Sequence, residues 1–235
     1  MEHLQRHIFS LPYSQLDGLS HFRILNGMEM EFKFSVPSAA AFERLATISS
    51  VAGYRLSRPK HITIHDRYFD TSDLLIRKAG FGARIRSIES RLLLTLKGLG
   101  HADKRGLHVR SELEMPIVAD SQECRLTAAK KYLPEKLRKL LGQKPLSVQF
   151  EVDTRRTIRT GTHSSGRSFE LSLDISRFFT PGTKQKRYEV EIEAEEIGEA
   201  ELTRVAEIIS SSFELTPTCI SKFEFGLSFY KKDTS

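Results

Sequence analysis

The sequence has no tryptophan and only two cysteines, Cys124 and Cys219, among its 235 residues. Two cysteines are too few for a disulfide framework or a thiolate metal site, and they fit a reducing compartment such as the cytoplasm. We therefore expect both to be packing residues. The chain also lacks an apolar run near the ~20 residues that span a membrane, and its N-terminus lacks the apolar core of a signal peptide. The sequence predicts a soluble cytoplasmic protein with no membrane partner.

Several catalytic motifs are also missing. No Ser-His-Asp or Cys-His constellation is evident, and the glycine-rich stretch 97–110 lacks the spacing and the terminal Lys-Ser/Thr of a P-loop. His61 and His65 lie in a segment with strand character, so we expect them to be structural or surface residues rather than metal ligands. The net charge of +6 favours an anionic partner.

The most informative feature is a repeated alternation of apolar and charged residues. In MEMEFKF (28–34), Met30, Phe32 and Phe34 alternate with Glu29, Glu31 and Lys33, which is the period of a strand with one apolar and one charged face. For one strand, a solvated sheet face explains this pattern. Its recurrence with nearly pure ionisable faces favours a closed antiparallel barrel with its charges inside. The alternation returns at 81–87, 92–98, 109–116, 171–176 and 188–195, and further strands are predicted at 61–71 and 147–159.

Segments of helical periodicity are available to cover the apolar exterior of such a barrel. Residues 37–53 predict a helix with Ser38 as N-cap and Gly53 as its stop. Further helices are predicted at 121–142, interrupted at Pro134, at 198–213 and at 217–232. The expected fold class is α+β, a closed antiparallel β-barrel or tunnel with a charged interior, buttressed by helices. Residues 28–232 are expected to form this domain, with 1–27 as an extension of undecided role. The inward residues of the helices are predicted to be Leu126, Ala129, Leu137, Leu140 and Leu141 in 121–142, and Leu202, Val205, Ala206 and Ile209 in 198–213.

The predicted interior holds a cationic set and an acidic set of equal size. Burying so many charges only as mutual salt bridges is costly, because desolvation can exceed their attraction. The arrangement makes more sense if the carboxylates hold hard divalent cations and the basic groups hold phosphate oxygens. A linear triphosphate carries about four to five negative charges near neutral pH, and two Mg²⁺ offset roughly four of them. The cationic set is Lys33, Arg84, Arg86, Lys97, Arg110, Arg156 and Lys222; the acidic set is Glu29, Glu31, Glu112, Glu114, Asp174, Glu189 and Glu191.

These segments resemble the CYTH superfamily, the triphosphate tunnel metalloenzymes. EMEFK at 29–33 matches the ExExK signature, which alone is a weak signal. The specific signal is the series that follows it in family order, over about residues 28–230. The series consists of DRYFDT (66–71), GARIR (82–86), LTLKG (94–98), RSELE (110–114), VDTRRT (152–157), SLDIS (172–176), YEVEIE (188–193) and SKFEFGL (221–227).

The resemblance implies roles for both sets. Glu29 and Glu31, joined by Glu189 or Glu191, are expected to bind a first Mg²⁺ or Mn²⁺. The cationic set is expected to bind the phosphates and stabilise their charge during catalysis, with Arg156 preferred over Arg155 and Lys222 reaching the phosphates from a C-terminal helix. For Tyr68 and Asp70, substrate contact and a turn role both stay open. The expected ligands of a second metal and its water are Glu112, Glu114, Asp174 and the remaining late-strand glutamate.

The implied activity is metal-dependent hydrolysis of a triphosphate, with inorganic tripolyphosphate as the leading substrate and pyrophosphate and phosphate as products. A class IV adenylyl cyclase is an alternative, although the sequence reveals no nucleoside pocket. Thiamine, nucleoside or RNA 5′-triphosphatase activity also stays open, and only the last would bring a nucleic-acid partner. A non-catalytic polyphosphate-binding module is disfavoured because a pure binder needs fewer metal ligands. Both a monomer and a homodimer are compatible with the sequence.

Overall fold

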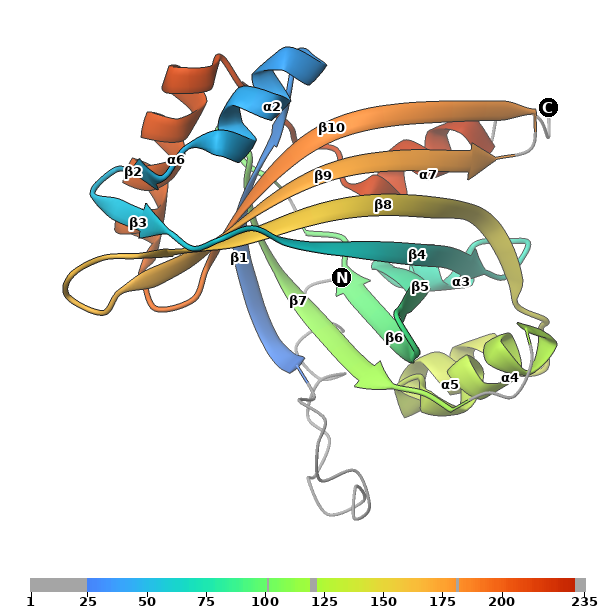
Figure 1. Cartoon of the computed structure of the whole chain (residues 1–235). Coiled ribbons are helices and arrows are strands. Elements are labelled where there is room, and N and C mark those ends of the chain that lie inside the picture. The colour runs from blue at the N-terminus through green and yellow to red at the C-terminus, as the bar shows by residue number, and fades with distance from the viewer. Residues whose placement is uncertain (1–24, 101, 119–121, 181, 231–235) are drawn as a thin grey trace.

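The computed structural model describes residues 25–100, 102–118, 122–180 and 182–230. Its centre is a closed ring of antiparallel strands (Figure 1), in the order β8-β4-β5-β6-β7-β1-β10-β9, with β9 pairing back to β8. The predicted barrel is therefore confirmed. The strands of the ring are β1 (Leu25–Ser35), β4 (Lys60–Asp70), β5 (Phe81–Ile88), β6 (Arg91–Gly98), β7 (Leu107–Pro116), β8 (Ser147–Thr162), β9 (Ser168–Thr180) and β10 (Thr183–Ala194).

Side chains alternate between the two faces of the ring, as the sequence pattern predicts. On β1, Phe32 and Phe34 are buried in an outer apolar core, whereas Glu31 and Lys33 are buried among charged groups of the interior. On β10, Val190 joins the same outer core. The period of two therefore directs the apolar side chains outward and the ionisable ones into the tunnel.

Helices cover the apolar outside of the barrel in two places (Figure 1). The helices α2 (Ala39–Thr47) and α6 (Glu199–Phe213) supply Phe42, Leu45 and the expected inward residues of α6 to a core shared with β1, β9 and β10. The second core lies against β5, β6 and β7 and is covered by α3 (Leu75–Lys78), α4 (Gln122–Tyr132) and α5 (Glu135–Leu141). Three short strands, β2 (Ser50–Val51), β3 (Tyr54–Leu56) and β11 (Thr216–Pro217), extend the sheet.

The last helix, α7 (Lys222–Tyr230), packs into one end of the barrel. Phe223 lies against the rings of Tyr68 and Phe150, which are inward residues of β4 and β8. Gly226 is needed for this approach, because a Cβ added there would come within 2.1 Å of the Phe150 ring. The helix therefore closes that end of the tunnel and carries Lys222 inward.

Some local predictions were wrong. The helix predicted at 37–53 begins after Ser38, whose hydroxyl accepts a hydrogen bond from the Ala41 amide as expected, but it ends at Thr47. The β-branched residues that follow favour strand, and Gly53, at φ +85°, forms the turn between β2 and β3. The C-terminal helix begins only at Lys222.

Two burial predictions also failed. Leu140 is 47% exposed, because α5 is short and buries Leu137 and Leu141 on its inner face. Cys219 is exposed and its thiol lies 3.2 Å from the Asp103 carbonyl oxygen; the Cys124 side chain lies outside the described residues. Among the described residues, no helix is both long and apolar enough to cross a membrane.

Candidate active site

A cavity of about 850 Å³ lies inside the barrel and collects most of the predicted site residues. The whole cationic set lines it, together with Glu29, Glu112, Glu114 and Glu191. The other members of the acidic set lie buried beneath its wall. Arg156 lines this cavity, whereas Arg155 is exposed on the outer face of β8. The members of the acidic set that lie buried beneath the cavity wall are Glu31, Asp174 and Glu189.

The first charge network joins β1, β6 and β7. The Lys97 ammonium donates to Glu29 at 2.7 Å and lies 3.2 Å from Glu112. Arg110 donates to Glu29 at 3.1 Å and also pairs with Glu31. Burial alone would raise the pKa of Glu29, but the charges of Lys97 and Arg110 hold it well below its usual range. Glu29 is therefore an ionised carboxylate in the interior.

The second network is centred on Lys222. Its ammonium donates to Glu191 at 2.7 Å and lies 2.9 Å from Asp174 and 3.3 Å from Glu189. Burial alone would lower the pKa of Lys222, yet the charges of these carboxylates raise it well above its ordinary value. Arg156 donates to Asp174 at 2.7 Å. The helix at the end of the barrel is thus anchored by a cation that the strands hold in place.

A third network depends on Asp66, which is not among the site residues predicted from the sequence. Asp66 is fully buried and accepts hydrogen bonds from Arg86 at 2.8 and 3.0 Å and from Arg84 at 3.4 Å. Burial alone would raise its pKa, but the two guanidinium groups lower it. Strand alternation places Asp66 on the inward face of β4, between Ile64 and Tyr68. Only the register shows that it lies opposite Arg86.

A group of carboxylates lines the part of the cavity that is remote from α7. Glu193 is paired in register with Glu31 on β1 and with Glu170 on β9. Burial and the neighbouring charges of Glu29 and Glu31 raise the pKa of Glu193 to about 8. Glu193 is the third glutamate of YEVEIE, so the alternation already places it on the face of Glu189 and Glu191. The acidic set predicted from the sequence nevertheless contains neither Glu193 nor Glu170.

The profile of the CYTH domain matches residues 27–218, from β1 through β10 and α6. The chain belongs to the CYTH domain family. Among curated protein sequences, none matches it significantly.

Solved structures support the fold of this CYTH domain. A Hippeastrum protein, HpAC1, is described as a candidate adenylyl cyclase with a dominant triphosphatase activity. It is 18% identical to this chain, and the two superpose with a TM-score of 0.56. The comparison covers 86% of this chain and 96% of the Hippeastrum chain. A Bacillus halodurans protein described as a candidate adenylate cyclase is 22% identical, with 84% and 95% covered and a TM-score of 0.54. At these identities the likeness concerns the fold alone.

The carboxylates of this CYTH domain are chemically suited to a hard divalent cation. Glu29, Glu31 and Glu193 approach one another closely enough to raise the pKa of Glu193, and oxygen donors are the ligands that Mg²⁺ and Mn²⁺ prefer. Within the described ranges, however, no group of three potential ligands is assembled around a point. Glu29 and Glu31 are held by Lys97 and Arg110 instead. Glu29 and Glu31 can therefore bind a metal only if Lys97 and Arg110 pair with another anion.

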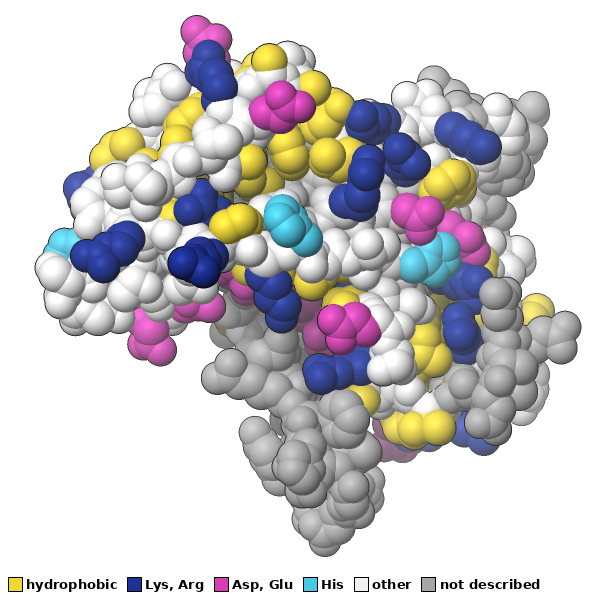
Figure 2. Space-filling view, in the orientation of Figure 1, with side chains coloured by type: hydrophobic (Ala, Val, Ile, Leu, Met, Phe, Trp, Pro, Cys, Tyr) yellow, Lys and Arg dark blue, Asp and Glu magenta, His cyan; other side chains and the backbone are white. Residues whose placement is uncertain are grey.

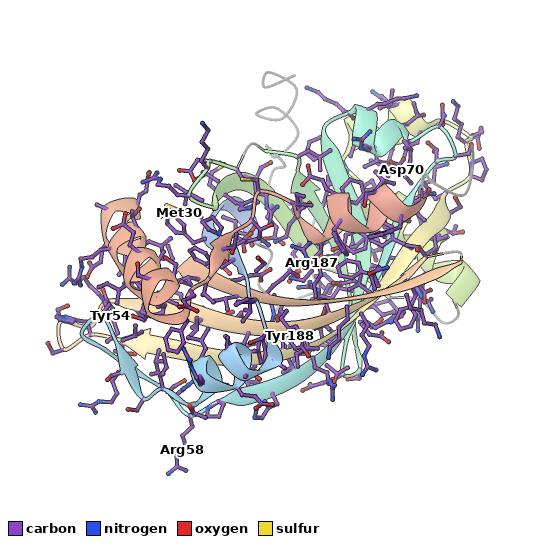
Figure 3. The ribbon with its side chains drawn as sticks, turned by 90° about the horizontal axis from the view of Figure 1, so that it is seen from above. Met30, Tyr54, Arg58, Asp70, Arg187 and Tyr188 are labelled. Carbon is purple, nitrogen blue, oxygen red and sulfur yellow. The ribbon has the colours of Figure 1, made fainter. Side chains whose placement is uncertain are left out.

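Asp70 has the turn role that the sequence left open. Its carboxylate is buried and accepts hydrogen bonds from the backbone amides of Thr71, Ile76 and Arg77 at 2.7 to 2.9 Å, which fixes the start of α3 (Figure 3). Tyr68 instead lines the cavity, where its hydroxyl accepts from Arg84 at 3.2 Å.

The outer face of the barrel carries charges of both signs (Figure 2). His65 lies on this face, where its ring nitrogen is 2.6 Å from Asp153, and the exposed His61 contacts Thr157. Both histidines are therefore surface residues paired with neighbours on β8, as predicted. The site is built from the inward face of the strands.

The raised pKa of Glu193 gives a testable pH dependence. Between about pH 4.5, the ordinary value, and about pH 8, the folded chain keeps a proton that the unfolded chain has lost, so this group's contribution to stability falls as the pH rises. We expect Glu193→Gln to raise the Tm relative to the original chain increasingly across this window, in metal-free buffer. Thermal unfolding from about pH 4 to about pH 9 measures this, with Glu196→Gln as an exposed control. A difference in Tm between the variant and the original chain that does not change with pH would contradict the raised pKa of Glu193.

Proposed function

We propose that this CYTH domain is a metal-dependent triphosphatase that hydrolyses inorganic tripolyphosphate to pyrophosphate and phosphate. The observation that carries the proposal is the convergence of the whole cationic set on one interior cavity, alongside carboxylates suited to divalent metals. Arginine forks grip phosphate oxygens bidentately and stay charged at any working pH, whereas lysines act as point charges. The dominant triphosphatase activity described for the Hippeastrum neighbour is consistent with this function.

The ion pairs of the interior suggest how substrate and metal enter together. Lys97 and Arg110 form ion pairs with Glu29, and Lys222 forms an ion pair with Glu191. When these cations turn to phosphate oxygens, they release carboxylates that are already buried and ionised. The barrel therefore exchanges one set of paired charges for another and exposes no unpaired charge. This exchange explains why a charged interior is compatible with a stable barrel.

The metal would be held by residues of the acidic set. Glu29 and Glu31 are the proposed ligands of the first Mg²⁺ or Mn²⁺, with Glu191 or Glu189 and with the neighbouring Glu193. A bound metal supplies Lewis-acid stabilisation of phosphate charge and lowers the pKa of a bound water. The protein's own part is alignment: Arg84, Arg86 and Arg156 orient the phosphates, and Lys222 approaches them from α7. Glu112, Glu114 and Asp174 are the proposed acidic residues of a second metal and its water.

The first test is the reaction itself. Purified protein with tripolyphosphate and Mg²⁺ or Mn²⁺ should release equal amounts of pyrophosphate and phosphate, which phosphorus NMR resolves. Excess chelator should abolish the release and added metal should restore it, because the buried carboxylates need a cation to approach the phosphates. Cyclic AMP measured with ATP in parallel separates hydrolysis from cyclisation. Undiminished tripolyphosphate cleavage in excess chelator would overturn the proposal.

A further inference from the structure

A second cavity opens on the outside of the barrel, between α2 and the strands β4, β8 and β9. It has a volume of about 400 Å³; we call it the outer cleft. The strand segments that carry the inward residues Ile62 and Arg156 separate it from the tunnel cavity. Its lining side chains on the outside of the barrel are Phe42 of α2, His61 and Thr63 of β4, Arg155 and Thr157 of β8, and Ile175 of β9.

Strand register gathers the polar groups of the outer cleft on one side. Arg155 lies opposite Thr63 on β4, and two positions further along the same strands Thr157 lies opposite His61. The imidazole Nδ1 of His61 is 3.0 Å from the hydroxyl oxygen of Thr157. A guanidinium, two hydroxyls and an imidazole therefore line the same side, where they can donate hydrogen bonds to several oxygens of one ligand.

The positive charge beside the outer cleft is not neutralised by the protein. Among the described residues, the side chain of Arg155 has no ion-pair or hydrogen-bond partner. In the next row, Arg177 lies directly opposite Lys186 on β10, and like charges in this arrangement destabilise a sheet. The acidic neighbour of Arg177 in register, Asp153, pairs with His65 instead. Lys and Arg side chains gather beside hydrophobic ones on this face (Figure 2), which therefore attracts anions.

The other side of the outer cleft is apolar. Ile175 is half-buried on the outer face of β9, in register with Arg155. Phe42 packs on Tyr188, with 5.4 Å between the ring centroids. A ligand that covers such apolar surface gains free energy roughly in proportion to the area covered. An apolar lining with a few convergent polar groups is typical of small-molecule sites, and the volume of about 400 Å³ falls in their ~300–1,000 Å³ range.

We propose that the outer cleft binds a phosphate monoester whose organic group is small and apolar. Near neutral pH such a phosphate carries about 1.5 to 2 negative charges and three strong acceptor oxygens. It therefore matches Arg155 with the hydroxyls of Thr63 and Thr157 better than a carboxylate, which has only two oxygens. The organic group lies against Ile175 and Phe42. This site lies outside the tunnel and does not depend on the proposed triphosphatase function.

Phenyl phosphate is the probe for the outer cleft, and inorganic phosphate is the comparison. Both anions can also enter the cationic tunnel, so a signal from the cleft itself is needed. The ring-proton NMR signals of His61, identified by their loss in His61→Gln, provide it. His65 is the internal reference, because it lies on the same face of β4 at a distance of ~13 Å, four strand residues further along.

Phenyl phosphate is expected to shift the His61 signals saturably and to leave those of His65 in place. It should bind at least about tenfold more tightly than inorganic phosphate, because its ring covers apolar surface. Equal shifts of both histidines, or no saturable shift of His61, would show that the cleft is not a site. Equal affinities of the two probes would remove the organic group from the proposal and overturn it.

Two variants test the two sides of the outer cleft. Arg155→Gln should weaken the binding of both probes by about tenfold or more, because a charge-assisted hydrogen bond is lost. Ile175→Thr should weaken phenyl phosphate severalfold and leave inorganic phosphate unchanged. The matched control is Arg91→Gln, which changes an exposed arginine at the start of β6 and should alter neither affinity. An affinity of Arg155→Gln equal to that of the original chain would overturn the proposal.

Discussion

Replacing Glu31 with glutamine is expected to lower the turnover of tripolyphosphate by roughly a hundredfold or more. The side chain is 1% exposed and pairs with Arg110 and with Lys33, the latter at 3.1 Å. Glutamine keeps the shape and the strand alternation but removes a negative charge from the proposed metal site. Stabilisation of transition-state charge of this kind is typically several kcal/mol. Higher concentrations of Mg²⁺ or Mn²⁺ should restore part of the lost rate.

Two measurements make the Glu31→Gln result decisive. The Tm of the variant establishes that the barrel is folded, and Glu43→Gln, on the exposed face of α2, is the matched control for loss of one carboxylate. If β1 presented only a solvated sheet face, the change would alter stability by at most about 0.5 kcal/mol and leave the rate almost intact. Activity equal to that of the original chain would remove Glu31 from the site.

The second large effect is expected from Asp66→Asn. This change leaves Arg84 and Arg86 without the buried carboxylate that both of them contact. Removing one partner of a buried ion pair typically costs about 3–5 kcal/mol, because the remaining charge is uncompensated. For a chain of this length that loss corresponds to a fall in Tm of about 10 °C. Chemical denaturation and calorimetry measure both quantities.

Ligand rescue distinguishes the role of Asp66 from simple packing. Tripolyphosphate with Mg²⁺ should recover more Tm in Asp66→Asn than in the original chain, because phosphate oxygens can take the place of the missing carboxylate beside the two arginines. Asp153→Asn provides the control, since Asp153 pairs with His65 on the partly exposed outer face, where ion pairs are worth at most about 1 kcal/mol. A destabilisation of Asp66→Asn below that value would contradict the expectation.

The sequence and the structure agree best where the information is local. Strand alternation predicted that Glu29, Glu31 and Lys33 share the inward face of β1. It did not predict the order of the strands or which side chains on other strands these residues contact. It could also have identified Glu193, because one more step of the same alternation reaches it. Helix ends were harder: the helix after Ser38 ends at Thr47, since the β2–β3 hairpin takes up the residues up to Gly53 and beyond.

The candidate site depends on contacts that no local pattern contains. Lys33 and Glu191 are 158 positions apart, yet the pairing of β1 with β10 brings them to 2.9 Å. Arg187 on β10 (Figure 3) is a further example, because its guanidinium lies 4.4 Å from the centre of the Phe225 ring on α7. Such pairs follow from strand register and from the way α7 enters the barrel.

The sequence by itself thus determined the class of fold, the face on which each charged side chain lies and the membership of both charge sets in one interior. The strand charges follow from a period of two that recurs in strand after strand, whereas Arg156 and Lys222 were assigned by the resemblance to the CYTH superfamily. Only the tertiary structure decided which charges meet, that Asp66 holds Arg84 and Arg86, and that α7 brings Lys222 to Asp174 inside the barrel. The reason is that closing the ring of strands fixes their register, and register alone places residues from distant segments side by side.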